Sequence, residues 1–276
     1  MNARAHGLSI IANTIRHDII NMLTESKSGH TAGPLGLADI FAALYFDYIN
    51  INPKKPNDEN RDYLILSNGH VCPVLYAALA NKEFFDKEEL YNLRKLGTRL
   101  QGHPHREALP GLETTSGPLG SGLSQAAGKA LVLKRKEKKN KVVCICSDGE
   151  HQEGNHWEAI MLAAKYKLGN LIVIVDRNRI QIDGNTEDIM PLKSLKEKYL
   201  SFGWGAIEIN GNDMTQIIKA LDKTKHYRTH PLVIIANTTP GKGVSFIENN
   251  YKWHGKTPTK EEAERAIYEL KKKRIA

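Results

Sequence analysis

The sequence is poor in cysteine: its 276 residues include only Cys72, Cys144 and Cys146. Cys144 and Cys146 lie two positions apart in a strand-like segment, where side chains at i and i+2 face the same side and do not normally form a disulfide. No cysteine spacing typical of a metal site is present. We therefore expect a chain without disulfides that works in a reducing compartment, the cytoplasm.

Long hydrophobic runs are also absent. No stretch approaches the roughly 20 apolar residues that a membrane-spanning helix needs. Near the N-terminus, apolar residues recur at helical spacing, but Arg16, His17 and Asp18 interrupt any run that could resemble a secretory signal. We expect no membrane association.

The net charge of +8 raises the question of nucleic-acid binding. Much of the positive charge lies in two runs, 134–141 and 271–274, which fall at the ends of predicted helices. No aromatic residues interleave with these runs, as a surface for single strands would usually require. We interpret the runs as solvated helix ends and expect no nucleic-acid partner. A general attraction for sugar phosphates is compatible with the charge.

Helical and strand patterns alternate along the chain, which predicts an α/β fold with a mostly parallel sheet and helices on both faces. The strands are continuous apolar blocks, as expected when both faces are covered. No internal repeat or linker interrupts the pattern, so we predict one domain over residues 1–276. The predicted helices are 3–25, 35–49, 71–82, 86–97, 119–139, 154–168, 213–227 and 259–274, and the predicted strands are 62–67, 141–147, 170–177, 204–209 and 231–238.

Asp148 and Asn178 each end a run that is typical of a buried strand. The helix predicted between them has the length of a crossover connection, so both residues should lie at the same edge of the sheet, where open α/β folds bind ligands. A carboxylate and an amide oxygen can hold one hard cation there, and the cation can hold an anion over the following helix N-terminus. Alone, Asp148-Gly149 would more often be a turn or a helix cap.

Four further loops are rich in glycine, and three of them contain histidine. A fifth loop follows the last predicted strand. Because loops at a sheet edge often carry the chemistry of a fold, histidines beside glycines suggest imidazoles presented to a closely held ligand. The five segments are Ser28–Gly36, Leu66–His70, Gln101–His105, Thr115–Gly122 and Pro240–Gly255.

Taken together, these segments resemble the N-terminal half of transketolase, most closely the split form in which the diphosphate-binding domain is a separate chain. The likeness runs in order from Ser28-Gly-His30 to Trp253-His-Gly255. Ser147-Asp148-Gly149 and Asn178, 30 positions after Asp148, resemble the thiamine diphosphate motif Gly-Asp-Gly…Asn. The resemblance implies a thiamine diphosphate-binding fold.

The resemblance also implies a metal and a cofactor. Asp148, Asn178 and the backbone carbonyl of Ile180 would bind Mg²⁺, for which Ca²⁺ or Mn²⁺ could substitute. Gly149 and Glu150 would offer backbone N–H groups to the diphosphate of thiamine diphosphate. The other cofactor contacts implied are His70, Gly117, Leu119, Asp176, Asn178, Ile182 and His254, with Ile182 packing on the thiazolium ring.

Four histidines resemble those that surround the donor ketose in this family. Ketol transfer moves protons near neutral pH, and imidazole is the side chain suited to this task. Taken singly, each would more often be a loop hydrogen-bonder. The family context assigns catalytic roles to His30, His70, His103 and His254, whereas His105, His151 and His156 are interpreted as structural.

The implied reaction is transfer of a two-carbon ketol unit from a ketose phosphate to an aldose phosphate. The family also needs a pyrimidine-binding domain with a glutamate that protonates the cofactor, and no segment of this sequence supplies it. We therefore expect a C-terminal partner subunit in an α₂β₂ assembly. Two alternatives are an enzyme of the same type with another sugar pair, and a catalytically silent homologue that scaffolds or regulates a partner. A P-loop is disfavoured because Gly241-Lys-Gly243 lacks the required spacing.

Two positions depart from the family pattern. Ser147 replaces the first glycine of the metal motif, so a positive φ at this position would be strained. Thr31-Ala32 follows His30 where the family commonly has Pro-Gly, so the shape of the loop near the donor site, and with it the choice of substrate, could differ.

Overall fold

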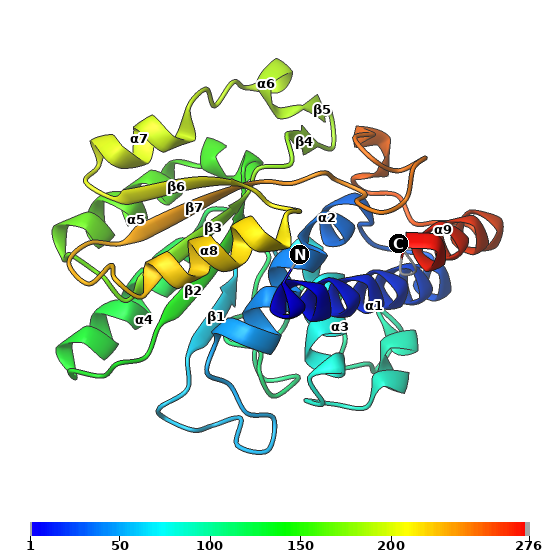
Figure 1. The fold of residues 1–276 in the computed structure, drawn as a ribbon, viewed down its shortest axis with the longest axis horizontal. Coiled ribbons are helices and arrows are strands. Elements are labelled where there is room, and N and C mark those ends of the chain that lie inside the picture. The colour runs from blue at the N-terminus through cyan, green and yellow to red at the C-terminus, as the bar shows by residue number, and fades with distance from the viewer. Residues whose placement is uncertain (1, 274–276) are drawn as a thin grey trace.

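A computed structural model of the chain describes residues 2–273 and shows a five-stranded parallel sheet between two layers of helices (Figure 1). The strand order is β1-β2-β3-β7-β6, and every neighbouring pair is parallel. The strands are β1 (Tyr63–Leu66), β2 (Val142–Ser147), β3 (Leu171–Asp176), β6 (Gly205–Asn210) and β7 (Leu232–Asn237).

Alternate residues of the strands enter two separate cores, because successive side chains of a strand point to opposite faces of the sheet. Val143 and Ile145 of β2 join the core beneath α1 (Ala3–Ser26), α2 (Ala32–Ala43), α3 (Cys72–Asn81), α8 (Met214–Thr224) and α9 (Lys260–Lys273). Val142 and Cys144 join the core beneath α4 (Ser121–Arg135), α5 (Gly154–Lys165) and α7 (Leu195–Ser201). The predicted α/β class with covered faces is confirmed.

Several predicted elements differ in their bounds. The second helix begins at Ala32 instead of 35, and its last turn widens into a π-helical segment, Leu44–Tyr48. The helix predicted over 86–97 is only the 3₁₀ segment Lys87–Asn92, because Leu93 has a non-helical ψ of 126° and Arg94 has a φ of 61°. Position 274, the end of the last predicted helix, lies outside the described residues.

Short elements between β3 and β6 escaped prediction. A two-residue hairpin pairs β4 (Ile180–Gln181) with β5 (Gly184–Asn185), followed by α6 (Thr186–Ile189) and α7. Three more 3₁₀ segments are Gly69–Val71, Gly149–Gln152 and Tyr251–Trp253. The hairpin and the 3₁₀ segments lie at the carboxyl edge of the sheet, where the loops after β1, β2, β3 and β7 converge, whereas α7 packs on the face covered by α4 and α5.

The three cysteines are buried and free, with Cys144 Sγ and Cys146 Sγ 3.6 Å apart. No helix within residues 2–273 is both long and apolar enough to cross a bilayer. The first basic run coincides with the end of α4, where Lys134 donates hydrogen bonds to the carbonyls of Tyr166 and Lys167. That run is therefore a helix end, as interpreted from the sequence.

Candidate functional site

A cleft of about 440 Å³ opens at the carboxyl ends of the strands. Of the residues predicted for the site, all but Glu150 and Asp176 line it. They come from loops far apart in the sequence, as expected when parallel strands deliver their carboxyl ends to one edge. The predicted residues that line the cleft are His30, His70, His103, Gly117, Leu119, Asp148, Gly149, Asn178, Ile180, Ile182 and His254.

Asp148 follows β2 directly and is almost completely buried. Its Oδ1 accepts the N–H of Gly149 at 2.7 Å, and its Oδ2 accepts the N–H of Arg179 at 2.8 Å and Arg177 Nη1 at 3.0 Å. Burial raises the pKa of the Asp148 carboxyl, while Arg177 acts in the opposite direction. The carboxylate is therefore fixed by donors from both adjacent strand ends, with lone pairs of Oδ1 still available toward the cleft.

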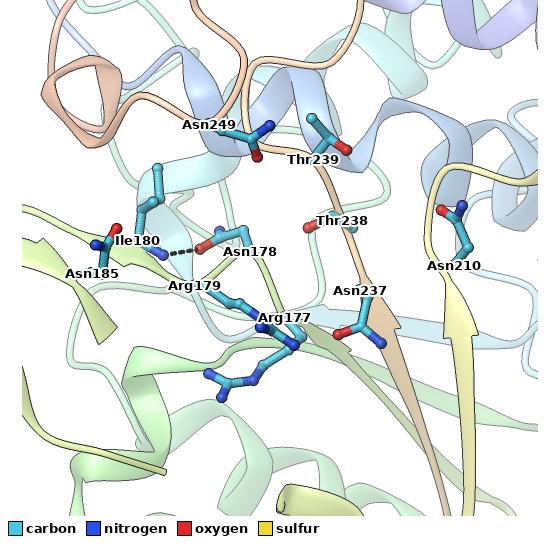
Figure 2. Close-up of a pocket in the computed structure, with 10 residues that line it drawn as sticks. All are labelled: Arg177, Asn178, Arg179, Ile180, Asn185, Asn210, Asn237, Thr238, Thr239 and Asn249. Atoms are coloured by element: carbon cyan, nitrogen blue, oxygen red, sulfur yellow. Dashed lines mark hydrogen bonds between the residues drawn. The ribbon is translucent and has the colours of Figure 1, made fainter. Parts of the chain in front are cut away.

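Asn178 is held by its neighbours in the turn after β3. Its Oδ1 accepts the N–H of Ile180 at 3.0 Å (Figure 2), and its Nδ2 donates to Asp176 Oδ2 at 2.7 Å. Arg179, between the two, adopts a left-handed φ of 63°. This conformation brings Asn178 and Ile180 to the wall of the same cleft as Asp148.

Asp176 and Glu150 lie behind the cleft. Asp176 is fully buried, accepts the hydroxyl of Thr238, and has a pKa raised to about 7 by burial. The Glu150 carboxylate accepts the hydroxyl of Ser67 and the N–H groups of Gly120 at 2.6 Å and Ser147 at 3.2 Å. Both carboxylates thus brace the loops that form the cleft. Because the carboxylate of Glu150 is occupied in this way, only its backbone N–H is left to contact a ligand, which is the contact that the sequence predicted.

His30, His70 and His254 form a packed cluster, with ring centroids 4.9 to 5.4 Å apart. Burial lowers the pKa of all three, that of His30 to about 4, so the rings are neutral at pH 7. The Nδ1 atoms of His30 and His254 are buried with no hydrogen-bond partner among the described residues. His103 lies on the exposed rim, where burial and Arg94 lower its pKa.

Two exposed apolar side chains, Leu119 and Ile182, line the cleft. Two glycines, Gly117 and Gly149, line it as well. A Cβ added at Gly117 would meet nothing within 4 Å, and one at Gly149 would meet only Gln181 Oε1 at 3.7 Å. Glycine at both positions therefore leaves backbone accessible from the cleft, where a side chain would fill the space of a ligand.

These features fit a diphosphate cofactor with a hard cation. Carboxylate, amide and carbonyl oxygens are the ligands that Mg²⁺ prefers, and Asp148, Asn178 and Ile180 bring one of each to the same wall. The unpaired imidazole nitrogens can serve a polar ligand, and Leu119 and Ile182 can cover an apolar ring. The chemistry of the donors thus agrees with the group that the resemblance implied.

Comparison with known proteins decides the family. The model for "Transketolase, thiamine diphosphate binding domain" matches residues 8–273. The chain belongs to the transketolase family. The resemblance and the enzyme class predicted from the sequence are therefore confirmed.

The chain is similar over its length to separate subunits of transketolases. It is 39% identical to a subunit of the apulose-4-phosphate transketolase of Phocaeicola vulgatus, over 92% of this chain and 90% of that protein. It is 39% identical to "6-deoxy-6-sulfo-D-fructose transketolase subunit SqwG" of a Clostridium species, over 95% of each. Human transketolase is 36% identical over 97% of this chain, which spans only 42% of the human protein.

Solved transketolases share the fold. The structure from Campylobacter jejuni superposes with a TM-score of 0.91 at 36% identity, covering 98% of this chain and 43% of that one. Transketolase from Leishmania mexicana gives a TM-score of 0.89 at 32% identity, covering 96% of this chain and 41% of that one. The chain thus corresponds to less than half of these transketolases.

The histidines interpreted as structural lie apart from the transketolase cleft. His151 and His156 are buried and share the hydroxyl of Tyr199, at 2.9 and 3.2 Å, and His105 is exposed.

Sequence reasoning missed the cleft residues Gln152, Glu153, Gln181 and Asp183, together with Arg177 beside Asp148. Arg177 carried a signal that could have been used: a charged residue directly after a buried strand needs a partner, and Asp148 ends the neighbouring strand.

Proposed function

We propose that this chain is the diphosphate-binding subunit of a two-chain transketolase that depends on thiamine diphosphate and Mg²⁺. It would transfer a two-carbon ketol unit from a ketose phosphate to an aldose phosphate. The observation that carries the proposal is the convergence of Asp148, Asn178 and three neutral histidines on one cleft. The family match and the full-length similarity to chains named as transketolase subunits support it.

Asp148, Asn178 and the carbonyl of Ile180 would hold the metal, and Mn²⁺ or Ca²⁺ could use the same oxygens. Gly149 and Glu150 would turn their N–H groups from their present acceptors, Asp148 Oδ1 and Ser147 Oγ, toward the diphosphate. His70 and His254 would reach the same anion. When bound, thiamine diphosphate supplies the electron sink for the two-carbon unit.

The residues of the cleft would position the reactants and move protons. His30, His70 and His254 are neutral at pH 7, so each ring has one nitrogen that can accept a proton and one that can donate a hydrogen bond. His103, on the rim, would serve the donor sugar. Gly117, Leu119 and Ile182 would flank the cofactor rings and exclude water, and Asp176 would keep Asn178 in place.

The proposal includes a partner. Residues 1–276 would form one diphosphate-binding domain, and the pyrimidine-binding and C-terminal domains, with the glutamate that protonates the cofactor, would lie on a second chain in an α₂β₂ assembly. Relatives of nearly the same length that are named as single subunits of a transketolase support two chains. The three free buried cysteines support a cytoplasmic setting.

The sugar pair could be specialised. Two relatives of equal identity are named for different substrates, apulose 4-phosphate and 6-deoxy-6-sulfo-D-fructose. Thr31 is one of the two residues after His30 that differ from the family pattern. Its hydroxyl donates a hydrogen bond to the Lys256 carbonyl at 2.6 Å and so connects the loop of His30 with the loop of His254. Assaying a panel of ketose phosphates with the two-chain enzyme would identify the donor.

The test of the proposed function uses two variants. Asp148→Ala should abolish Mg²⁺-dependent binding of thiamine diphosphate, measured by calorimetry on the chain with its partner, while circular dichroism remains that of a folded protein. His103→Ala is the matched control: it should retain cofactor affinity within about twofold and lower turnover by about 10² or more. Unchanged cofactor affinity in Asp148→Ala would remove Asp148 from the metal site and contradict the proposal.

A further inference from the structure

A second cleft, of about 540 Å³, lies beside the first and is lined by the residues drawn in Figure 2. It is bounded by the carboxyl ends of β3, β7 and β6, and Asn178 and Ile180 line both clefts. Its position at the carboxyl edge of a parallel sheet is where open α/β folds bind ligands. None of the catalytic histidines proposed above lines it, and within residues 2–273 Asn178 and Ile180 are its only residues that also line the first cleft.

The cleft carries positive charge that is not neutralised by its walls. Arg177 is buried and its guanidinium is occupied by Asp148 and Glu187. Arg179 is exposed, and its side chain has no ion pair or hydrogen bond within residues 2–273. Its backbone is in the left-handed region, with a φ of 63°. The free guanidinium favours an anion.

The rest of the wall is polar and has spare hydrogen-bonding capacity. Figure 2 shows Asn249 and Thr239 on one side of the cleft and Asn237 on the other. Asn237 donates through Nδ2 to Glu208 at 3.0 Å, while its Oδ1 is buried without a partner among the described residues. The side chains of Asn249 and Thr239 make no hydrogen bond to any residue within 2–273. Amides and hydroxyls at these positions suit a ligand with several hydroxyl groups.

The lining also excludes other classes of ligand. Ile180 is the only apolar residue that residues 2–273 contribute to it, so this part of the chain offers no aromatic ring or broad apolar wall to a ligand. The volume suits a molecule of about the size of a phosphorylated sugar, and a guanidinium matches a phosphate in geometry as well as charge.

We propose that this second cleft binds a small sugar phosphate or a related phosphorylated polyol, with Arg179 on the phosphate and Asn249, Thr239 and Asn237 facing the hydroxyl groups. Asn249 has a φ of 58°, so both principal contacts stand on left-handed backbone, which glycine can adopt without strain. Glycine variants therefore remove the side chains while preserving the loops. In Arg179→Gly, the backbone N–H that holds Asp148 is retained.

The experiment is calorimetric titration of the full chain, without thiamine diphosphate and in phosphate-free buffer, using ribose 5-phosphate, inorganic phosphate and ribose as probes. We expect saturable binding of ribose 5-phosphate that is tighter than that of phosphate or ribose alone. Arg179→Gly should weaken it by about tenfold or more, the effect of losing a charged hydrogen bond. Asn249→Gly should also weaken it.

Two controls locate the effect. Lys167→Gly removes an exposed cation from a backbone with φ of 49° far from the cleft, and should leave binding unchanged. His103→Ala alters the first cleft and should also leave it unchanged. The proposal is overturned if ribose 5-phosphate does not bind saturably, binds no tighter than phosphate, or loses binding in His103→Ala but not in Arg179→Gly. Because cofactor binding is not measured, the outcome is independent of the Asp148 test above.

Discussion

At the scale of single residues, Ser147 shows how the turn Ser147-Asp148-Gly149 accommodates a side chain at its first position. Its φ is not in the left-handed region, so the Cβ causes no backbone strain. Its hydroxyl accepts the N–H of Glu150 at 3.3 Å, and its carbonyl accepts His151 Nδ1 at 2.9 Å. The serine therefore acts as a local brace at the end of β2, in a place where the motif usually has glycine.

We expect Ser147→Gly to destabilise the protein by about 1 kcal/mol, because glycine gains freedom in the unfolded chain and the hydroxyl acceptor is lost. Ser147→Ala keeps the Cβ and should cost only about half as much. Urea denaturation of both variants measures the difference. A glycine variant more stable than the wild type would mean that the serine backbone is strained after all.

Residue identity predicted the walls of the cleft better than the groups behind them. Asp148, Asn178 and the histidines could be placed because each belongs to a motif that exposes it at a loop. Asp176 was predicted to lie close to the cofactor, and its side chain faces protein partners; for Glu150 only a backbone contact was predicted, and the sequence did not indicate where its carboxylate lies. A motif fixes which residues gather at a site, whereas the rotamer of a buried carboxylate depends on donors from other loops, here Thr238 and Gly120.

At the scale of elements, continuous apolar strands were predictable and short polar pieces were not. α7 has only seven residues, but Ser194 caps it by accepting the N–H of Glu197 at 3.2 Å, and Ser194…Glu197 has the spacing of a capping box. The predicted helix over 86–97 had apolar residues at suitable spacing, but Leu96 is fully exposed and buries nothing. Periodicity alone therefore overestimated that helix.

α7 is held to the sheet by Tyr199, whose hydroxyl meets His151 and His156 beneath it. Burial lowers the pKa of His151 to about 4, whereas a histidine in the unfolded chain titrates near 6.5. Between these values the unfolded chain binds more protons than the folded one. The stability contributed by neutral His151 is thus complete above about pH 6.5 and is lost as the pH falls toward 4.

We therefore predict that the stability difference between wild type and His151→Gln shrinks by roughly 2 kcal/mol from pH 7 to pH 5, since glutamine does not titrate. Chemical denaturation at several pH values measures it. The raised pKa of Asp176 changes the stability in the opposite direction over the same pH range. Because Asp176 is present in both proteins, its contribution cancels when the variant is compared with the wild type. A constant difference for His151→Gln would show that this ring is not held neutral.

At the scale of the whole molecule, the sheet order brings four strand-end loops to one edge, and the sequence predicted this because alternating helices and buried strands favour parallel pairing. What the alternation could not predict is the surface beside the cleft. The segment after β4 exposes Ile182, Ile189 and Met190 by 70, 46 and 56%. Large apolar side chains gathered on one segment are typical of a surface that another chain covers.

The last prediction concerns that second chain. If the cleft supplies the diphosphate end of the site and the partner supplies the pyrimidine end, ketol transfer requires both. Titrating the partner chain into a fixed amount of this one, with thiamine diphosphate and Mg²⁺ in excess, should raise activity linearly until the two are equimolar and no further. A charged residue at the exposed segment but outside the cleft, Met190→Asp, should shift this curve to higher partner concentration, whereas Leu96→Asp, an exposed leucine on another loop, should not. Full turnover by this chain alone would contradict the two-chain assembly, because all catalytic groups would then lie within these residues.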